Sequence, residues 1–129
     1  MHKKYIATGS VLAAIAVALG AFGAHGLKKI VPPETVQTFQ TGVQYQMYHS
    51  LALLLTGLLF EKCYQKFAKF AGLFFLLGIF LFSGSLYLLT YLNATETVGL
   101  NKIGLVTPFG GISFIAGWFF LFLAAIKNK

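Results

Sequence analysis

The sequence predicts an all-helical integral membrane protein, an antiparallel four-helix bundle that forms a single domain over residues 1–129. Hydrophobic residues make up 57% of the chain and charged residues only 10%, whereas soluble domains have about 25% charged residues. The hydrophobic residues also gather into four runs, at about 5–26, 43–60, 70–92 and 108–126. As helices, these runs can cross a hydrocarbon core of about 30 Å.

The first run, at 5–26, is expected to be the central packing helix. Gly9, Ala13, Ala16, Gly20 and Gly23 follow one another at alternating steps of four and three, so they share one helical face. Small-residue faces are where helices approach one another in lipid. The basic start and apolar run are also typical of a secretory signal. However, the run is longer than a signal core, so we expect the segment to be retained.

The next segment, 34–46, is polar but periodic. Val36, Phe39 and Val43 recur at helical spacing among glutamines and threonines. This pattern predicts a short amphipathic helix that lies at the membrane interface before the second span, with a bend at Gly42. The two prolines that precede it favour a helix start.

The second span, 43–60, has one polar and small face that includes Tyr45 and His49, and this face should point into the bundle. The third span, 70–92, is rich in phenylalanine and leucine, apart from Ser83-Gly84-Ser85 near its middle. The fourth span should begin with Thr107 as a cap and Pro108 in the first turn. Helix packing is expected at Gly9, Gly20, Gly23, Gly84, Gly110 and Gly117.

The charges lie at the ends of the runs and predict an orientation. The ten basic residues are all lysines, and they outnumber three acidic residues. Seven lysines fall on the side of the two termini and of the connection at 61–69, against three on the other side. Because cytoplasmic loops are enriched in lysine, we expect both termini in the cytoplasm. The lysines form no stripe, so we expect membrane lipids rather than nucleic acid as partners.

Two histidines suggest a polar pocket near the outer leaflet. His25 ends the first helix and His49 lies about one turn below the start of the second span, so adjacent antiparallel helices could bring them to similar depth. Ionisable groups inside a membrane indicate function by default. The alternative, which we favour, is that each histidine only hydrogen-bonds a loop or helix-end carbonyl and holds the turn in place. The candidate pocket residues are His25, Tyr45, His49, Ser83, Ser85 and Tyr87.

The sequence lacks the motifs that are typical of enzymes and of cofactor or metal sites. Two histidines are too few ligands for zinc, and Cys63, the single cysteine, belongs to the opposite side. No P-loop, Gly-x-Ser-x-Gly or His-Glu-x-x-His sequence occurs. We expect no metal, no cofactor, including haem, and no enzymatic activity.

Five short motifs are spread along the chain: Gly20-Ala21-Phe22-Gly23-Ala24-His25-Gly26-Leu27, Tyr45-Gln46-Met47-Tyr48-His49, Gly84-Ser85-Leu86-Tyr87, Thr107-Pro108-Phe109-Gly110-Gly111 and Gly117-Trp118. With these motifs, essentially the whole chain resembles a family of small bacterial inner-membrane proteins that is known only as domain of unknown function 423. At the residue after the second-span histidine, where the family typically has alanine, this chain has Ser50. The resemblance implies four helices in the plasma (inner) membrane of a bacterium, with no established reaction, cofactor or catalytic residue.

The sequence therefore favours a non-enzymatic membrane protein with a structural, membrane-stabilising or partner-assembly role, for which a homo-oligomer is one form. The alternative is a small lipid-binding, ligand-binding or conducting membrane protein that uses the outer-leaflet pocket around His25 and His49. A single four-helix bundle fills its own centre with side chains, so a conducting pore would require an oligomer or a polar-lined axis.

Overall fold

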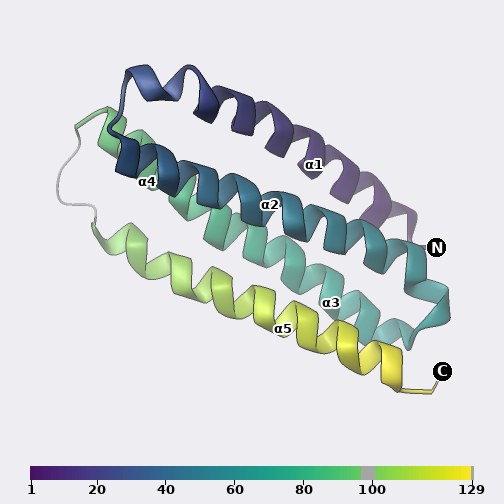
Figure 1. The fold of residues 1–129 in the computed structure, drawn as a ribbon. Coiled ribbons are helices and arrows are strands. Elements are labelled where there is room, and N and C mark those ends of the chain that lie inside the picture. The colour runs from purple at the N-terminus through teal and green to yellow at the C-terminus, as the bar shows by residue number, and fades with distance from the viewer. Residues whose placement is uncertain (97–100, 129) are drawn as a thin grey trace.

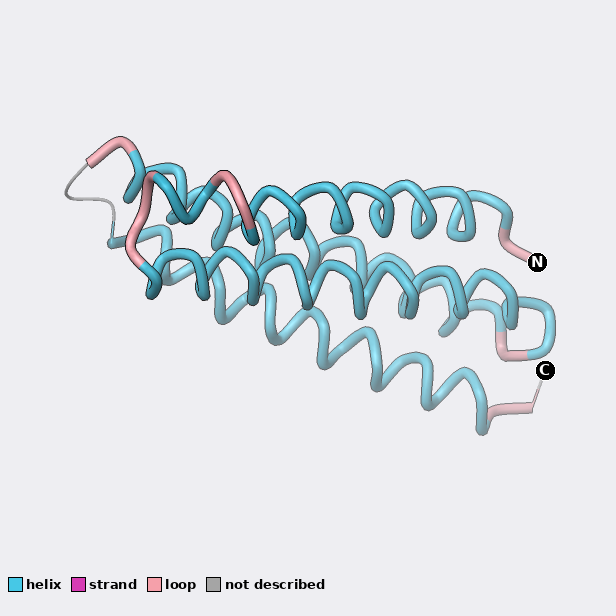
Figure 2. Tube along the Cα trace, turned by 45° about the horizontal axis from the view of Figure 1, so that its top comes forward, coloured by secondary structure: helices cyan, strands magenta, loops and turns pink. Residues whose placement is uncertain are grey.

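The computed structural model describes residues 1–96 and 101–128, and within these ranges the chain is helical throughout its length apart from short connections (Figures 1 and 2). A π-helical segment, η3, joins α3 to α4 without a break, so the two form one long rod. The α-helices are α1 (Lys3–Ala24), α2 (Pro33–Leu59), α3 (Gln65–Gly78), α4 (Gly84–Ala94) and α5 (Val106–Ile126). The shorter elements are η1 (Leu27–Lys29), η2 (Phe60–Lys62), η3 (Ile79–Ser83) and η4 (Asn101–Leu105).

These rods pack lengthwise and antiparallel, and both termini lie at the same end of the molecule (Figures 1 and 2). Helix α1 packs along α2, and α5 packs along α3 and η3. Helix α2 lies between the two pairs, because it also contacts α3, η3 and α4. The predicted all-helical antiparallel four-helix bundle is confirmed.

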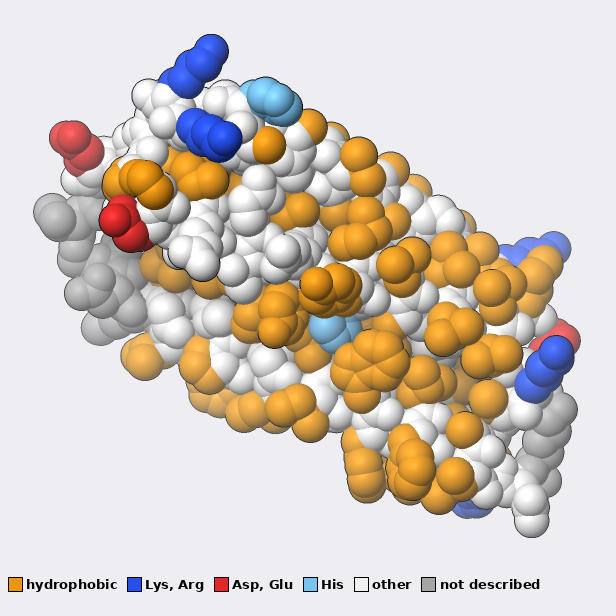
Figure 3. Space-filling view, in the orientation of Figure 1, with side chains coloured by type: hydrophobic (Ala, Val, Ile, Leu, Met, Phe, Trp, Pro, Cys, Tyr) orange, Lys and Arg blue, Asp and Glu red, His pale blue; other side chains and the backbone are white. Residues whose placement is uncertain are grey.

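Three helical stretches of the described chain are long and apolar enough to cross a membrane: Lys3–Lys29, Gln65–Ala94 and Ile103–Ile126. Helix α2 has 27 residues, but its N-terminal half is rich in glutamine and threonine. In the space-filling view, hydrophobic side chains cover most of the long face, and the charged side chains lie at its two ends (Figure 3). This distribution is typical of a protein that is surrounded by lipid along its length.

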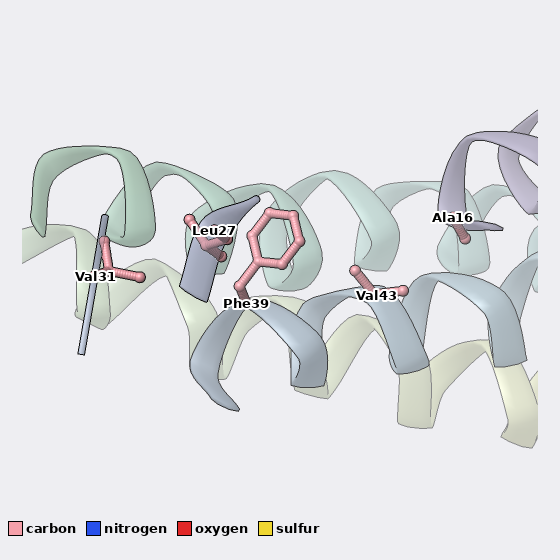
Figure 4. Packing of buried hydrophobic residues seen from close by; sticks show 5 residues of the cluster. All are labelled: Ala16, Leu27, Val31, Phe39 and Val43. Carbon is pink, nitrogen blue, oxygen red and sulfur yellow. The ribbon is translucent and has the colours of Figure 1, made fainter. Parts of the chain in front are cut away.

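The separate interfacial helix that the sequence predicted does not form. Residues Pro33–Leu59 are one continuous helix, and Gly42 lies buried in its middle instead of at a bend. Phe39 and Val43, which should have faced the interface, belong to a buried cluster with three residues of the preceding segment (Figure 4). The apolar face of this half of α2 is therefore covered by protein and not by lipid headgroups. The cluster contains Ala16, Leu27, Val31, Phe39 and Val43.

Glycines allow close approach at several helix crossings. A Cβ atom at Gly9 would lie 2.7 Å from the Ser50 carbonyl oxygen, and one at Gly23 would lie 2.9 Å from the Phe39 ring. At Gly110 a Cβ would overlap the backbone of η3 and lie 2.7 Å from Phe82 Cα. At these three positions a larger side chain would collide with the neighbouring helix, so glycine permits the close helix contact.

The other predicted packing glycines differ in how tightly they are enclosed. A Cβ at Gly117 would lie 2.6 Å from the Phe75 ring, and one at Gly20 would lie 3.3 Å from Val43. Gly84 does not pack against another helix, because the nearest atom to its Cβ position is the Ile79 oxygen of its own rod, at 4.0 Å. The prediction for Gly84 was therefore wrong.

Helix α5 also begins differently from the prediction. It starts at Val106, and Leu105, which precedes it, already has helical backbone angles because η4 leads directly into the helix. Thr107 therefore lies inside the first turn and does not cap it. Its hydroxyl instead lies 2.6 Å from the hydroxyl of Ser85.

Candidate functional site

Several buried polar side chains of the bundle gather around the middle of α2: Gln46, His49 and Ser50 of α2 and Ser83 of η3. Two less buried side chains bond to them, the half-buried Tyr87 of α4 and Trp118 of α5, which is 45% exposed. We call these six residues the polar core, and it links α2 to α1, η3, α4 and α5.

Gln46 joins three helices at one point. Its side chain is 3% exposed, and its Nε2 donates a hydrogen bond to the Leu12 carbonyl of α1 at 2.8 Å. Its Oε1 accepts a hydrogen bond from the Tyr87 hydroxyl of α4 at 2.6 Å. Because a carbonyl can only accept, the contact with Leu12 fixes the orientation of the amide. The Gln46 amide is thus bound to protein groups at both ends.

His49 is held on both ring nitrogens. Its Nδ1 lies 2.8 Å from the Tyr45 carbonyl one turn earlier, and its Nε2 accepts a hydrogen bond from Trp118 Nε1 at 3.0 Å. The carbonyl can only accept and the indole can only donate. The ring must therefore be neutral, with its hydrogen on Nδ1. The ring also stacks on Phe114, with 3.5 Å between centroids.

Ser83 ties the π-helical segment to α2. It is fully buried, and its hydroxyl donates a hydrogen bond to the Gly42 carbonyl at 2.6 Å. The ring of Tyr87 covers the same glycine, since a Cβ there would lie 2.9 Å from the ring. A π-helical turn contains an extra residue and often marks a functional region. Here it lies in contact with α2 on one side and with Gly110 of α5 on the other.

Ser85 belongs to a different place. Its hydroxyl donates to the Phe82 carbonyl at 2.8 Å, so it accepts from Thr107 at 2.6 Å. Ser85 borders a shallow depression of about 320 Å³, and Gly84, Leu88 and Val106 also line it. This surface lies between α4 and the start of α5.

His25 is not part of the polar core. It is exposed at the end of α1, and its Nδ1 lies 2.9 Å from the Ala21 carbonyl. Its neighbour Gly23 packs against Gln40, whereas Gly9, near the other end of α1, packs against Ser50. His49 lies nine positions after Gln40 along α2, roughly 14 Å at 1.5 Å per residue. The structure does not bring the two histidines to the same depth.

The six residues of the predicted pocket therefore do not lie in one place. Tyr45, which is 38% exposed, lies beside His49 with 6.1 Å between their ring centroids. Ser83 and Tyr87 contact α2 near Gly42 and Gln46, while Ser85 and His25 lie elsewhere. Within the described residues, no group of three or more His, Cys, Asp or Glu side chains could hold a metal ion.

Sequence reasoning missed Gln46 and Trp118 as members of this site. Gln44, two residues before Gln46, is by contrast exposed. The signal that could have found Gln46 is spacing, because Gly42, Gln46, His49 and Leu53 follow at steps of four and three and are all buried. No pattern in the sequence pairs Trp118 with His49.

All the buried side-chain nitrogen and oxygen atoms of the described residues have a hydrogen-bond partner. Each of these atoms is thus already bonded within the chain, and none is left without a partner. The arrangement can therefore hold helices in one register, and this is the chemistry that its geometry provides.

Comparisons with known proteins identify relatives over nearly the whole chain. Residues 19–111 match the family model described as Protein of unknown function (DUF423). The chain is similar to the UPF0382 membrane protein YwdK of Bacillus subtilis, with 42% identity over 126 residues, 97% of this chain and 98% of the relative. It is also similar to a UPF0382 membrane protein of Haemophilus influenzae, with 38% identity over 129 residues, 100% and 98% of the two chains.

A further relative is the UPF0382 inner membrane protein YgdD of Escherichia coli, with 40% identity over 115 residues, 89% of this chain and 83% of the relative. No solved structure matches the chain.

Proposed function

The chain belongs to the DUF423 family of proteins of unknown function, and we propose that it is a non-enzymatic, structural protein of the bacterial inner membrane. Its role is to present a rigid helical surface for membrane stabilisation or partner assembly. The observation that supports this proposal is the hydrogen bonding of His49, whose two ring nitrogens are both bound within the chain. The imidazole of His49, an ionisable group in the second span, thereby serves to hold helices together.

The rest of the polar core supports the same proposal. Gln46 binds α1 and α4, and Ser83 binds α2. In lipid, helices gain little from apolar contact with one another, so interhelical hydrogen bonds and close backbone contacts determine how they pack. A network that connects α2 to all its neighbours would specify one arrangement of the bundle.

We also propose that the chain crosses the membrane four times with both termini in the cytoplasm. Helix α2 accompanies α1 over its length, since Gly9 contacts Ser50 and Gly23 contacts Phe39. The side with the two termini carries seven of the ten lysines, which favours the cytoplasmic side. The name of the Escherichia coli relative, an inner membrane protein, supports the location.

Native mass spectrometry, combined with thermal unfolding, tests the structural role. We expect the protein released gently from its own membrane to carry exchangeable lipid and no stoichiometric small molecule. His49→Leu should lower the unfolding free energy by about 1 kcal/mol or more, because it removes the acceptor of the Trp118 hydrogen bond. His25→Leu is the matched control and should leave stability nearly unchanged, because His25 is exposed.

One result would refute this role. If a stoichiometric extra mass is present and His49→Leu removes it without changing thermal stability, the polar core is a ligand site. The second hypothesis, a binding or conducting protein, would then be correct.

A further inference from the structure

The outward face of α2 bears polar side chains that the bundle does not use. Six positions follow one another at steps of four and three, which is the heptad spacing of a coiled-coil seam. Tyr48, Leu51 and Leu55 are 54%, 54% and 44% exposed, and Gln37 and Gln44 are exposed as well. We call this surface the α2 seam: Gln37, Thr41, Gln44, Tyr48, Leu51 and Leu55.

The glutamines of α2 divide into two pairs. The inward pair is bonded to α1, since Gln40 donates to the Gly20 carbonyl at 3.2 Å and Gln46 to the Leu12 carbonyl at 2.8 Å. Gln37 and Gln44, on the seam, make no side-chain hydrogen bond to any residue that the structure describes. In Figure 3 uncharged polar side chains and backbone, drawn white, cover the part of the face that the N-terminal half of α2 occupies in Figure 1.

Gln44 lies at membrane depth. Its neighbour Val43 contacts Gly20, and Gly42 contacts Leu86 and Tyr87. These three partners belong to stretches that are apolar enough to span the membrane. An amide without a partner is costly in hydrocarbon, where no water can bind it. At this depth a hydrogen-bonding partner outside the chain would therefore stabilise the Gln44 side chain.

We propose that this partner is a second copy of the chain, packed in parallel along the α2 seam about a two-fold axis normal to the membrane. Such an axis brings each seam residue to its own copy at the same depth. Glutamine and tyrosine side chains both donate and accept, so Gln37, Gln44 and Tyr48 can each bond their own copies. Thr41 already donates to the Gln37 carbonyl of its own helix at 3.0 Å. Charged residues could not, and the seam has none.

Lipid alone suits the outward face of α5 better than the α2 seam. The exposed large side chains of α5 include Phe109, Ile112, Ile115 and Phe119, and these four offer no polar atom to a partner. On the seam, Leu51 and Leu55 follow the polar residues at heptad positions. They extend the contact toward the C-terminal end of α2, as in a coiled coil. This dimer goes beyond the proposed structural role, because it specifies the partner and the residues at the contact.

Disulfide crosslinking in native membranes tests the seam. In a Cys63→Ala background, which removes the single cysteine, Gln44→Cys and Leu51→Cys should each form disulfide-linked dimers on oxidation with copper phenanthroline. The matched controls are Ile112→Cys and Phe119→Cys on α5. These positions are 62% and 57% exposed and lie at similar depths, since Gly110 contacts the η3 segment that binds Gly42, and Trp118 binds His49.

A second measurement keeps the test independent of disulfide chemistry. Gln44→Leu, in the full chain in lipid vesicles, should weaken dimerisation measured by fluorescence energy transfer by about threefold to tenfold, as expected for interhelical hydrogen bonds. Ile112→Ala should leave it unchanged.

The proposal is overturned by equal crosslinking at all four positions, by crosslinking on α5 alone, or by a protein that stays monomeric in vesicles. Each of these results would leave the proposed structural role intact, because the polar core uses no seam side chain.

Discussion

Gly110→Ala should destabilise the protein, whereas Gly111→Ala, at the adjacent residue, should not. A Cβ at Gly110 would overlap the Phe82 backbone nitrogen and lie 2.7 Å from Phe82 Cα. A backbone cannot move aside as a flexible side chain can, so α5 must separate from η3. A Cβ at Gly111 has no atom within 4 Å among the described residues.

The expected changes are opposite in sign. Overpacking typically costs about 1–3 kcal/mol, so Gly110→Ala should lower the unfolding free energy by that amount. Alanine is favoured over glycine in a helix by about 1 kcal/mol, so Gly111→Ala should be neutral or stabilising. Reversible unfolding in mixed micelles measures both variants. Equal effects at the two positions would mean that α5 does not contact the π-helical segment as described.

Gln46→Leu is the second substitution with a large expected effect. It removes the acceptor of the hydroxyl of Tyr87, a half-buried residue whose ring packs on Gly42, and leaves that hydroxyl without this partner. An unpaired buried polar group costs about 1–3 kcal/mol. The variant should therefore lose stability by that amount, although leucine is the more apolar side chain.

The double variant separates the hydrogen bond from simple packing. Tyr87→Phe alone leaves Gln46 Oε1 unpaired, but in Gln46→Leu/Tyr87→Phe neither unpaired atom remains. The double variant should therefore cost less than the sum of the single variants, with a coupling of about 0.5–2 kcal/mol. Strictly additive losses would show that the two side chains do not interact.

The helices could be predicted from the sequence because hydropathy and length decide which segments cross a membrane. The run at 5–26 corresponds to α1, and the run at 108–126 corresponds to α5. The resemblance to the DUF423 family is also confirmed, since the family model matches residues 19–111. The π-helical segment η3 has no distinguishing pattern, because its residues differ little from those around it.

The start of the second span was predicted too late along α2, for one physical reason. Hydropathy counts Gln40 as unfavourable in a membrane, but its amide is bonded to the Gly20 carbonyl. A pattern along one helix cannot reveal such a partner on another. The second span was therefore expected to start at Val43, which placed His49 near the outer surface beside His25. Because the helix begins at Pro33, His49 lies much deeper.

The candidate site could be predicted in part. The small and polar face of α2 was identified with His49. We favoured histidine bonding to a loop or helix-end carbonyl, and His25 does lie beside such a carbonyl, that of Ala21. His49 Nδ1 lies instead beside the Tyr45 carbonyl in the interior of α2. The contact between His49 and Trp118 joins residues 69 positions apart. It depends on how α2 and α5 pack, which spacing within either helix does not specify.

The central claim is that the polar core binds helices to one another and not to a ligand. The most direct test is a long-range proton–nitrogen NMR correlation spectrum of the protein labelled with nitrogen-15 at histidine and tryptophan. We predict a neutral His49 ring with its hydrogen on Nδ1, and a Trp118 indole N–H that exchanges slowly because it donates to Nε2. A hydrogen on Nε2, or a rapidly exchanging Trp118 N–H, would contradict the account.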